Sequence, residues 1–150
     1  MLKNRVMKEK PSDEEMKKRL KALQETFSAQ TLQVKARKIP VIVLIEGWGT
    51  AGKGNLIGRI INNIDPRFYR VASLEKIREE DTRKPFLWRF VKEIPEAGNF
   101  VFMDSGWMDQ ITREYAQGNL SKKNYTLRVA GVKRFERQPV SYTNLRAHET

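Results

Sequence analysis

The feature that most constrains the fold is an apolar run, a glycine-rich turn and a helical pattern in direct succession. Residues 40–45 (PVIVLI) are continuously apolar and rich in β-branched side chains. Such a run is typical of a strand buried on both faces of a parallel sheet. After the glycines of residues 47–54, apolar side chains recur at helical spacing from Leu56 to Ile64, which predicts an amphipathic helix. Residues 65–67 (DPR) then end that helix with a turn.

The turn reads GWGTAGKG over residues 47–54 and matches the pattern GxxxxGK of a phosphate-binding loop. Glycines let successive backbone N–H groups approach phosphate oxygens without a Cβ in the way. The following helix presents its N-terminus to the anion, and the lysine adds a mobile positive charge. The sequence therefore predicts phosphate binding by Gly47, Gly52, Lys53 and Gly54. The last of these departs from the standard loop, which has Ser or Thr there as an Mg²⁺ ligand.

The rest of the chain alternates between strand and helix patterns. Strands are predicted at residues 68–74 and 99–103, and helices at residues 82–94, in a shorter stretch ending at 117–118, and at 121–138. This order predicts an α/β fold built from βαβ units on a parallel sheet.

A polar helix is predicted before the loop. Ser12 and Glu15 fit a capping box, and an apolar stripe runs from Met16 to Phe27 at helical spacing. We expect this stripe to pack on a core or on another subunit, and it hints at a homo-oligomer.

Asp104 follows the predicted strand at residues 99–103. An aspartate at the carboxyl end of an apolar strand is the natural Walker B partner of a phosphate-binding loop, where it holds Mg²⁺. Such a residue can also merely cap the next turn. Because the loop is present, the sequence favours the metal-binding role.

The charge of the chain favours a polyanionic partner. The formal net charge is +11, with 29 Lys and Arg against 18 Asp and Glu. Nucleic acid, anionic lipid and a phosphate-rich substrate all fit this surplus, as does a merely solvated basic surface. The absence of cysteine excludes disulfides, thiolate zinc sites and cysteine nucleophiles. No apolar run is long enough to cross a bilayer, and no signal peptide is recognisable. We therefore expect a cytoplasmic protein with no membrane partner.

Together these residues resemble the type-2 polyphosphate kinase family, whose loop has the form GxDxxGKG and so explains Gly54. The resemblance covers residues 39–138 and continues through five further pieces of sequence: residues 64–67, Lys76, and residues 85–90, 94–98 and 135–138. It implies a P-loop NTPase-like three-layer sandwich with a parallel sheet. It also implies Mg²⁺-dependent phosphoryl transfer between inorganic polyphosphate and a nucleotide (AMP, ADP or GDP). The Gly-Trp loop and the Trp-Arg-Phe segment look most similar to the tandem-domain polyphosphate:AMP phosphotransferases.

The resemblance carries over site residues with two departures. Lys53, Asp104 and Glu114 match catalytic positions of the family, and Asp104 matches its metal ligand. The family's loop aspartate, which helps to hold Mg²⁺, falls on Gly49, and its phosphate-contacting arginine falls on Ser105. Whether the site is active is therefore open. Lys76 and Arg89 are weaker candidates for contacts with polyphosphate or nucleotide, and solvated surface cations explain them equally well.

The same resemblance predicts how the chain is divided. Residues 1–38 are expected to form an amphipathic helical extension, and residues 39–138 a family domain that is incomplete at its C-terminus. Residues 139–150 lack the apolar strand that the family has next, and we interpret them as a foreign tail. Together with the two departures, this division predicts the first, degenerate repeat of a two-repeat enzyme.

Three alternatives to an active phosphotransferase stay open. The domain could be a non-catalytic repeat that binds phosphate or polyphosphate and supports an active partner domain. A different P-loop kinase of small molecules is disfavoured by Gly54. A nucleic-acid module is permitted by the charge, but the chain has neither an RNA-binding aromatic motif nor a zinc-finger pattern, so no nucleic-acid partner is expected.

Overall fold

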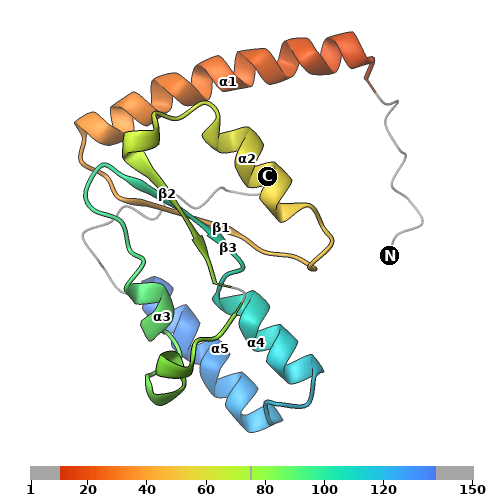
Figure 1. The fold of residues 1–150 in the computed structure, drawn as a ribbon, viewed down its shortest axis with the longest axis vertical. Coiled ribbons are helices and arrows are strands. Elements are labelled where there is room, and N and C mark those ends of the chain that lie inside the picture. The colour runs from red at the N-terminus through yellow and green to blue at the C-terminus, as the bar shows by residue number, and fades with distance from the viewer. Residues whose placement is uncertain (1–10, 75, 138–150) are drawn as a thin grey trace.

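Within the residues that the structure describes, a parallel sheet of three strands lies between layers of helices (Figure 1). The structure, a computed structural model, describes residues 11–74 and 76–137. The strands β1 (Val41–Ile45), β2 (Tyr69–Ser73) and β3 (Phe100–Asp104) are arranged in the order β1-β3-β2. Both outer strands pair in parallel with β3. The predicted α/β fold with a parallel sheet is confirmed.

Helices cover both faces of this sheet, which gives three layers (Figure 1). Helices α1 (Asp13–Ala36) and α2 (Lys53–Ile61) lie on one face. Helices α3 (Trp88–Val91), α4 (Trp107–Ala116) and α5 (Lys122–Arg137) lie on the other.

The central strand β3 supplies the core of both layers. Because successive side chains of a strand point to opposite faces, Phe100 and Phe102 enter the cluster beneath α1 and α2, while Val101 and Met103 enter the cluster beneath α3, α4 and α5. All four of these side chains are at most 5% exposed. The strand that ends at Asp104 is therefore held rigidly on both sides.

The strand before the loop is less buried than its sequence predicts. Every residue of β1 is only half-buried, although the continuous apolar run predicted burial on both faces. The reason is topological: β1 is at one edge of the described sheet, and the chain places β3, not β1, at the centre.

Helix α1 begins at the predicted capping box, with the Ser12 hydroxyl accepting a hydrogen bond from Glu15 N at 3.2 Å. Its apolar stripe divides into two parts. Phe27 packs edge-on against Phe100, with ring centroids 6.5 Å apart. Nearer the N-terminus, Met16 and Leu20 are each 50% exposed. The C-terminal part of the stripe thus packs on the core, as predicted, and the oligomer contact stays a prediction.

The helix predicted at residues 82–94 is wrong. A 3₁₀ turn, η2 (Glu79–Arg83), and the single-turn helix α3 stand there instead, with an extended residue, Lys84, between them. Lys84 precedes Pro85, and a residue before proline is pushed out of the helical region. Apolar side chains do recur at helical spacing in this segment, but Pro85 separates η2 from α3.

The other predicted boundaries agree with the structure within a few residues. Helix α5 ends at Arg137, so residues 138–150, including the supposed foreign tail, lie outside the described part. No helix in residues 11–74 and 76–137 is both long and apolar enough to span a membrane.

The turn after α2 offers a test of local electrostatics. Asp65 caps the short 3₁₀ turn η1 (Pro66–Phe68), and the Arg67 side chain and then its backbone N–H lower the pKa of this carboxyl to about 2, from 3.8. We expect Arg67→Gln to return the pKa toward 3.8, measured by carboxyl ¹³C NMR, while Arg59→Gln leaves it at about 2. Because the pKa is depressed, the stability that Asp65 contributes is present above pH 3.8 and is lost as the pH falls through about 2. An unchanged value in Arg67→Gln would contradict this assignment.

Candidate phosphate-binding site

The loop of residues 47–54 joins β1 to α2, and two of its glycines have backbone conformations that require glycine. Gly47 has φ 154° and Gly52, the N-cap of α2, has φ 81°, a region that side chains with a Cβ rarely adopt. Gly49 and Gly54 have no such constraint, and a Cβ built on either meets no atom within 4 Å. A hydroxyl or carboxyl side chain would therefore fit at both positions, and the chain has neither.

Lys53 is the first residue of α2 and is folded back over the loop. Its side chain is 9% exposed, and its Nζ donates hydrogen bonds to Gly47 O at 2.9 Å and Trp48 O at 3.3 Å. The same nitrogen lies 3.9 Å from Asp104 Oδ1. The ammonium group is thus held at the loop by neutral carbonyls and by one carboxylate at the limit of ion-pair distance.

Asp104 is brought to this place by the sheet. It ends β3 and is in register with Ile45 on one side and Ser73 on the other. Its Oδ1 is buried and accepts no hydrogen bond from any described residue. The cation beside this oxygen is Lys53 Nζ, at 3.9 Å. The Asp104 side chain as a whole is 30% exposed, so its carboxylate can also meet a cation from solution.

The donor set decides which cation fits. The described part of the chain holds no group of three or more His, Cys, Asp or Glu side chains that could bind a metal on their own. Mg²⁺ commonly uses one or two carboxylates, with phosphate oxygens and water completing its octahedron. Asp104 fits that mode of binding, and a metal site made by protein side chains alone does not exist among these residues.

Glu46 is a residue of the site that the sequence analysis missed. It directly follows β1, and its Oε1 accepts hydrogen bonds from Met108 N at 3.1 Å and Asp109 N at 3.4 Å in the first turn of α4. A Cβ on Gly106 would collide with this carboxylate. Glu46 therefore caps the start of α4. Its only local signal was a carboxylate placed directly before the loop. The metal-binding role of Asp104 stays a prediction.

Removing this cap gives a prediction with a pH dependence. Burial raises the pKa of Glu46 above its ordinary 4.5, against the lowering effect of the Asp109 and Met108 amides. With the pKa raised, stability tied to Glu46 is greatest below pH 4.5 and is lost as the pH rises through the raised value. Glu46→Gln keeps an acceptor and should flatten that loss, whereas Glu46→Ala should cost about 1 kcal/mol in the free energy of unfolding. Urea unfolding between pH 4 and 8 measures both, and a Gln variant with the wild-type pH dependence would contradict the argument.

Glu114 has structural partners. On α4 it accepts a hydrogen bond from Gln110 Nε2 at 2.7 Å and forms an ion pair with Arg128 on α5. Neither of these contacts connects it to Lys53 or Asp104, the two residues that the structure brings together. The catalytic role of Glu114 stays a prediction.

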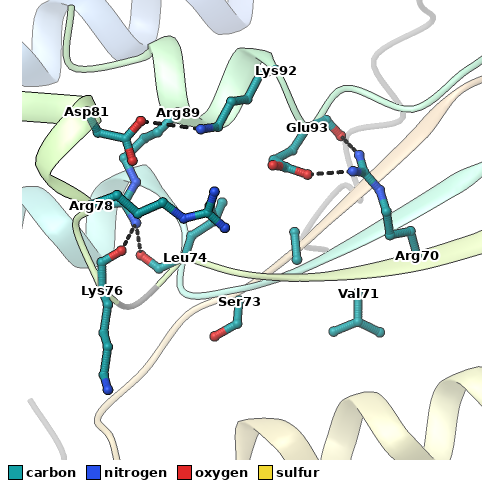
Figure 2. Close-up of a pocket in the computed structure, with 11 residues that line it drawn as sticks. Arg70, Val71, Ser73, Leu74, Lys76, Arg78, Asp81, Arg89, Lys92 and Glu93 are labelled. Atoms are coloured by element: carbon teal, nitrogen blue, oxygen red, sulfur yellow. Dashed lines mark hydrogen bonds and ion pairs between the residues drawn. The ribbon is translucent and has the colours of Figure 1, made fainter. Parts of the chain in front are cut away.

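Lys76 and Arg89 lie apart from the loop, in a hollow beside β2 (Figure 2). Arg89 is only 3% exposed and donates hydrogen bonds to Leu74 O and, at 2.8 Å, to Lys76 O. The interpretation of Arg89 as a solvated surface cation is therefore wrong. The Lys76 side chain is exposed, as that interpretation expected.

The two departures from the family pattern differ in their surroundings. Gly49 is open, as described above. Ser105 is 1% exposed, has φ 73°, and its hydroxyl finds no hydrogen-bond partner within the described residues. The Ser105 side chain is thus enclosed, whereas the space at Gly49 is open.

Comparison with known proteins identifies the fold and the family. The polyphosphate kinase 2 (PPK2) family model matches residues 10–145, a range that includes α1. The crystal structure of a polyphosphate kinase 2 from Pseudomonas aeruginosa superposes with a TM-score of 0.78 at 26% identity, over 84% of this chain and 28% of that one. The P-loop NTPase-like fold is thereby confirmed.

Curated relatives agree with the family match. The polyphosphate:AMP phosphotransferase of Pseudomonas syringae is 28% identical over 127 residues, which are 85% of this chain and 26% of the relative. The ADP-polyphosphate phosphotransferase 3 of Rhizobium meliloti is 29% identical over 119 residues, 79% of this chain and 42% of the relative. The chain thus spans about a quarter of the first relative's length and under half of the second's. With the family model matching most of its residues, this chain belongs to the polyphosphate kinase 2 family.

Proposed function

We propose that the chain takes part in phosphoryl transfer between inorganic polyphosphate and a nucleotide, with AMP, ADP or GDP as the nucleotide. The observation that carries this proposal is the position of Lys53 Nζ, 3.9 Å from Asp104 Oδ1 at the carboxyl ends of two paired strands. The names of the relatives, which join polyphosphate to AMP, ADP or GDP, support it. The cytoplasmic location and the homo-oligomer expected from the sequence remain part of the proposal.

The roles of the residues follow from their contacts. The loop amides and the N-terminus of α2 hold phosphate oxygens. Lys53 exchanges its bonds to the Gly47 and Trp48 carbonyls for bonds to phosphate, which places positive charge where the transferred group carries negative charge. Asp104 would hold Mg²⁺ through its carboxylate, and this ion, when bound, would neutralise charge on the phosphate oxygens. Glu46 fixes the start of α4 and so keeps the turn after Asp104 in place.

A transfer assay tests the proposal. The 150-residue chain is incubated with polyphosphate, Mg²⁺ and one nucleotide (AMP, ADP or GDP) in each of three reactions. The nucleotide products are then separated by ion-exchange chromatography. We expect a phosphorylated product from at least one of the three nucleotides. No product from any of them, under conditions in which the chain binds polyphosphate, would reject transfer by this chain.

A second function, a binding repeat without catalysis, is favoured by Gly49 and Ser105. Phosphoryl transfer depends on positioned charge, and the chain has glycine and a buried serine where the family has an aspartate and an arginine. This repeat would hold polyphosphate for an active partner domain.

Restoring the loop carboxylate separates the two functions. Gly49→Asp fits the open space at that position and should raise the Mg²⁺-dependent rate, by up to roughly 10²-fold if one electrostatic contact is recovered in full. Gly58→Asp, at an equally open glycine on α2, adds the same charge away from the loop and should not raise it. If both variants stay at the background rate while polyphosphate binding persists, the binding repeat is the better account.

A further inference from the structure

The side chain of Trp48 extends from the loop of residues 47–54 into solvent. It is 86% exposed, the largest exposed fraction of any large apolar side chain that the structure describes. Single exposed apolar side chains are common on protein surfaces, so exposure alone would not distinguish this residue. Its place in the loop does, because the loop is where phosphate is expected to bind.

The other two tryptophans have contacts that explain them. Trp107 is 6% exposed, and its ring packs edge-on against Phe90. Trp88 is 48% exposed, and the Lys84 ammonium lies 5.8 Å from the centre of its ring. The indole of Trp48 has neither a ring nor a cation of any described residue packed on it. Its large apolar surface thus contributes nothing to the packing of the described part of the chain.

The backbone of Trp48, in contrast, is held in place. Its carbonyl oxygen accepts hydrogen bonds from Ala51 N at 2.9 Å and from Lys53 Nζ at 3.3 Å. The same Nζ donates to the carbonyl of the preceding residue, Gly47. The residue that carries the free indole is therefore fixed next to the ammonium group that would bind phosphate.

This arrangement suits a ligand that has both a phosphate group and a planar ring. Stacking on an aromatic side chain contributes to the binding of every nucleobase, because each base has a π face. Polyphosphate has no ring. Of the two substrates proposed above, only the nucleotide can therefore use the indole.

We propose that Trp48 stacks on the base of a nucleotide whose phosphate is held by the loop of residues 47–54. The residue thereby distinguishes a nucleotide from other phosphate compounds at this loop. The choice of a nucleotide as ligand rests on the proposed function, whereas the place of the indole beside Lys53 does not. Because stacking does not read the hydrogen-bonding edge of a base, Trp48 accepts adenine and guanine alike.

The test is a calorimetric titration of the 150-residue chain with three ligands. AMP has a base, ribose 5-phosphate lacks the base, and tripolyphosphate lacks both base and sugar. AMP should bind the wild type more tightly than ribose 5-phosphate does. Trp48→Ala should weaken the binding of AMP roughly fivefold to hundredfold, the usual effect of losing one stacked base. Its affinities for ribose 5-phosphate and tripolyphosphate should stay at the wild-type values.

Two further variants separate stacking from a structural effect on the loop. Trp48→Phe keeps an aromatic face and should restore most of the affinity for AMP, and GMP should follow AMP in every variant. Trp88→Ala removes the partly exposed indole of α3, on the face of the sheet opposite to α2. This control should leave all the affinities unchanged.

Three results would overturn the proposal. They are AMP binding to the wild type no more tightly than ribose 5-phosphate, an unchanged affinity for AMP in Trp48→Ala, and equal weakening of both ligands by that variant. If tripolyphosphate binds in any of these cases, the loop stays a phosphate site and the proposed function is untouched. Conversely, a loss of AMP affinity in Trp48→Ala together with no product in the transfer assay would support the stacking and reject the transfer.

Discussion

Lys53→Ala is expected to lower the rate of phosphoryl transfer by roughly 10²–10³-fold, the usual effect of losing one positioned electrostatic contact to the reacting group. The lysine is the single cation that the structure holds over the loop carbonyls and beside Asp104 among the residues it describes. Alanine keeps the helix, because it is the best helix former, and removes only the charge and its stem. The rate is measured with polyphosphate, Mg²⁺ and the nucleotide that gives the most product.

Lys122→Ala is the matched control. Lys122 is likewise the first residue of a helix, α5, but it is exposed, and α5 lies on the face of the sheet opposite to α2. It should retain the wild-type rate. A Lys53→Ala variant that is folded by circular dichroism and keeps its rate within a factor of three would contradict the role given to this lysine.

The second large effect is expected for Asp104→Asn, which should abolish stimulation by Mg²⁺ and cost roughly 10²–10³-fold in rate at saturating Mg²⁺. The amide has the size of the carboxylate but lacks its charge, and it leaves no anionic oxygen for the metal. Without Mg²⁺, tripolyphosphate should bind this variant at least as tightly as the wild type, because a carboxylate beside Lys53 repels phosphate. Rates across an Mg²⁺ titration and calorimetry in EDTA measure the two effects.

Asp109→Asn is the control for that experiment, since its carboxylate forms an ion pair with Arg113 on the same helix. It should keep the wild-type response to Mg²⁺. If Asp104→Asn responds to Mg²⁺ as the wild type does, Asp104 does not hold the ion and the metal site has to be sought elsewhere.

The strands and the loop could be predicted because their signals are local. A continuous apolar run, a GxxxxGK pattern and a helical period each lie within a few residues, and the rule that parallel strands end at one edge brings Lys53 and Asp104 together. The helix predicted at residues 82–94 failed because Pro85 breaks the backbone pattern while the apolar period continues through it. The burial of β1 was overestimated because hydrophobicity does not tell which strand is central.

The parts of the site that the sequence could not show depend on distant backbone groups. Glu46 caps amides 62 and 63 residues further along the chain, and Arg89 is held by carbonyls 15 and 13 residues before it. Backbone atoms carry no residue-specific signal, so neither pairing is visible in the sequence. The sequence left Arg89 between a phosphate contact and a solvated cation, and it did not single out Glu46.

The central claim, that the loop binds phosphate through Lys53, can be tested at Trp48. This residue lies in the loop, its carbonyl accepts a hydrogen bond from Lys53 Nζ at 3.3 Å, and its side chain is 86% exposed. The chain has three tryptophans, so protein labelled with 5-fluorotryptophan should give three ¹⁹F resonances, with that of Trp48 assigned by Trp48→Phe.

The account predicts that tripolyphosphate shifts the Trp48 resonance in a saturable way in the wild type, and that Lys53→Ala removes this shift. A Trp48 resonance that does not move, or that moves equally in Lys53→Ala, would contradict it.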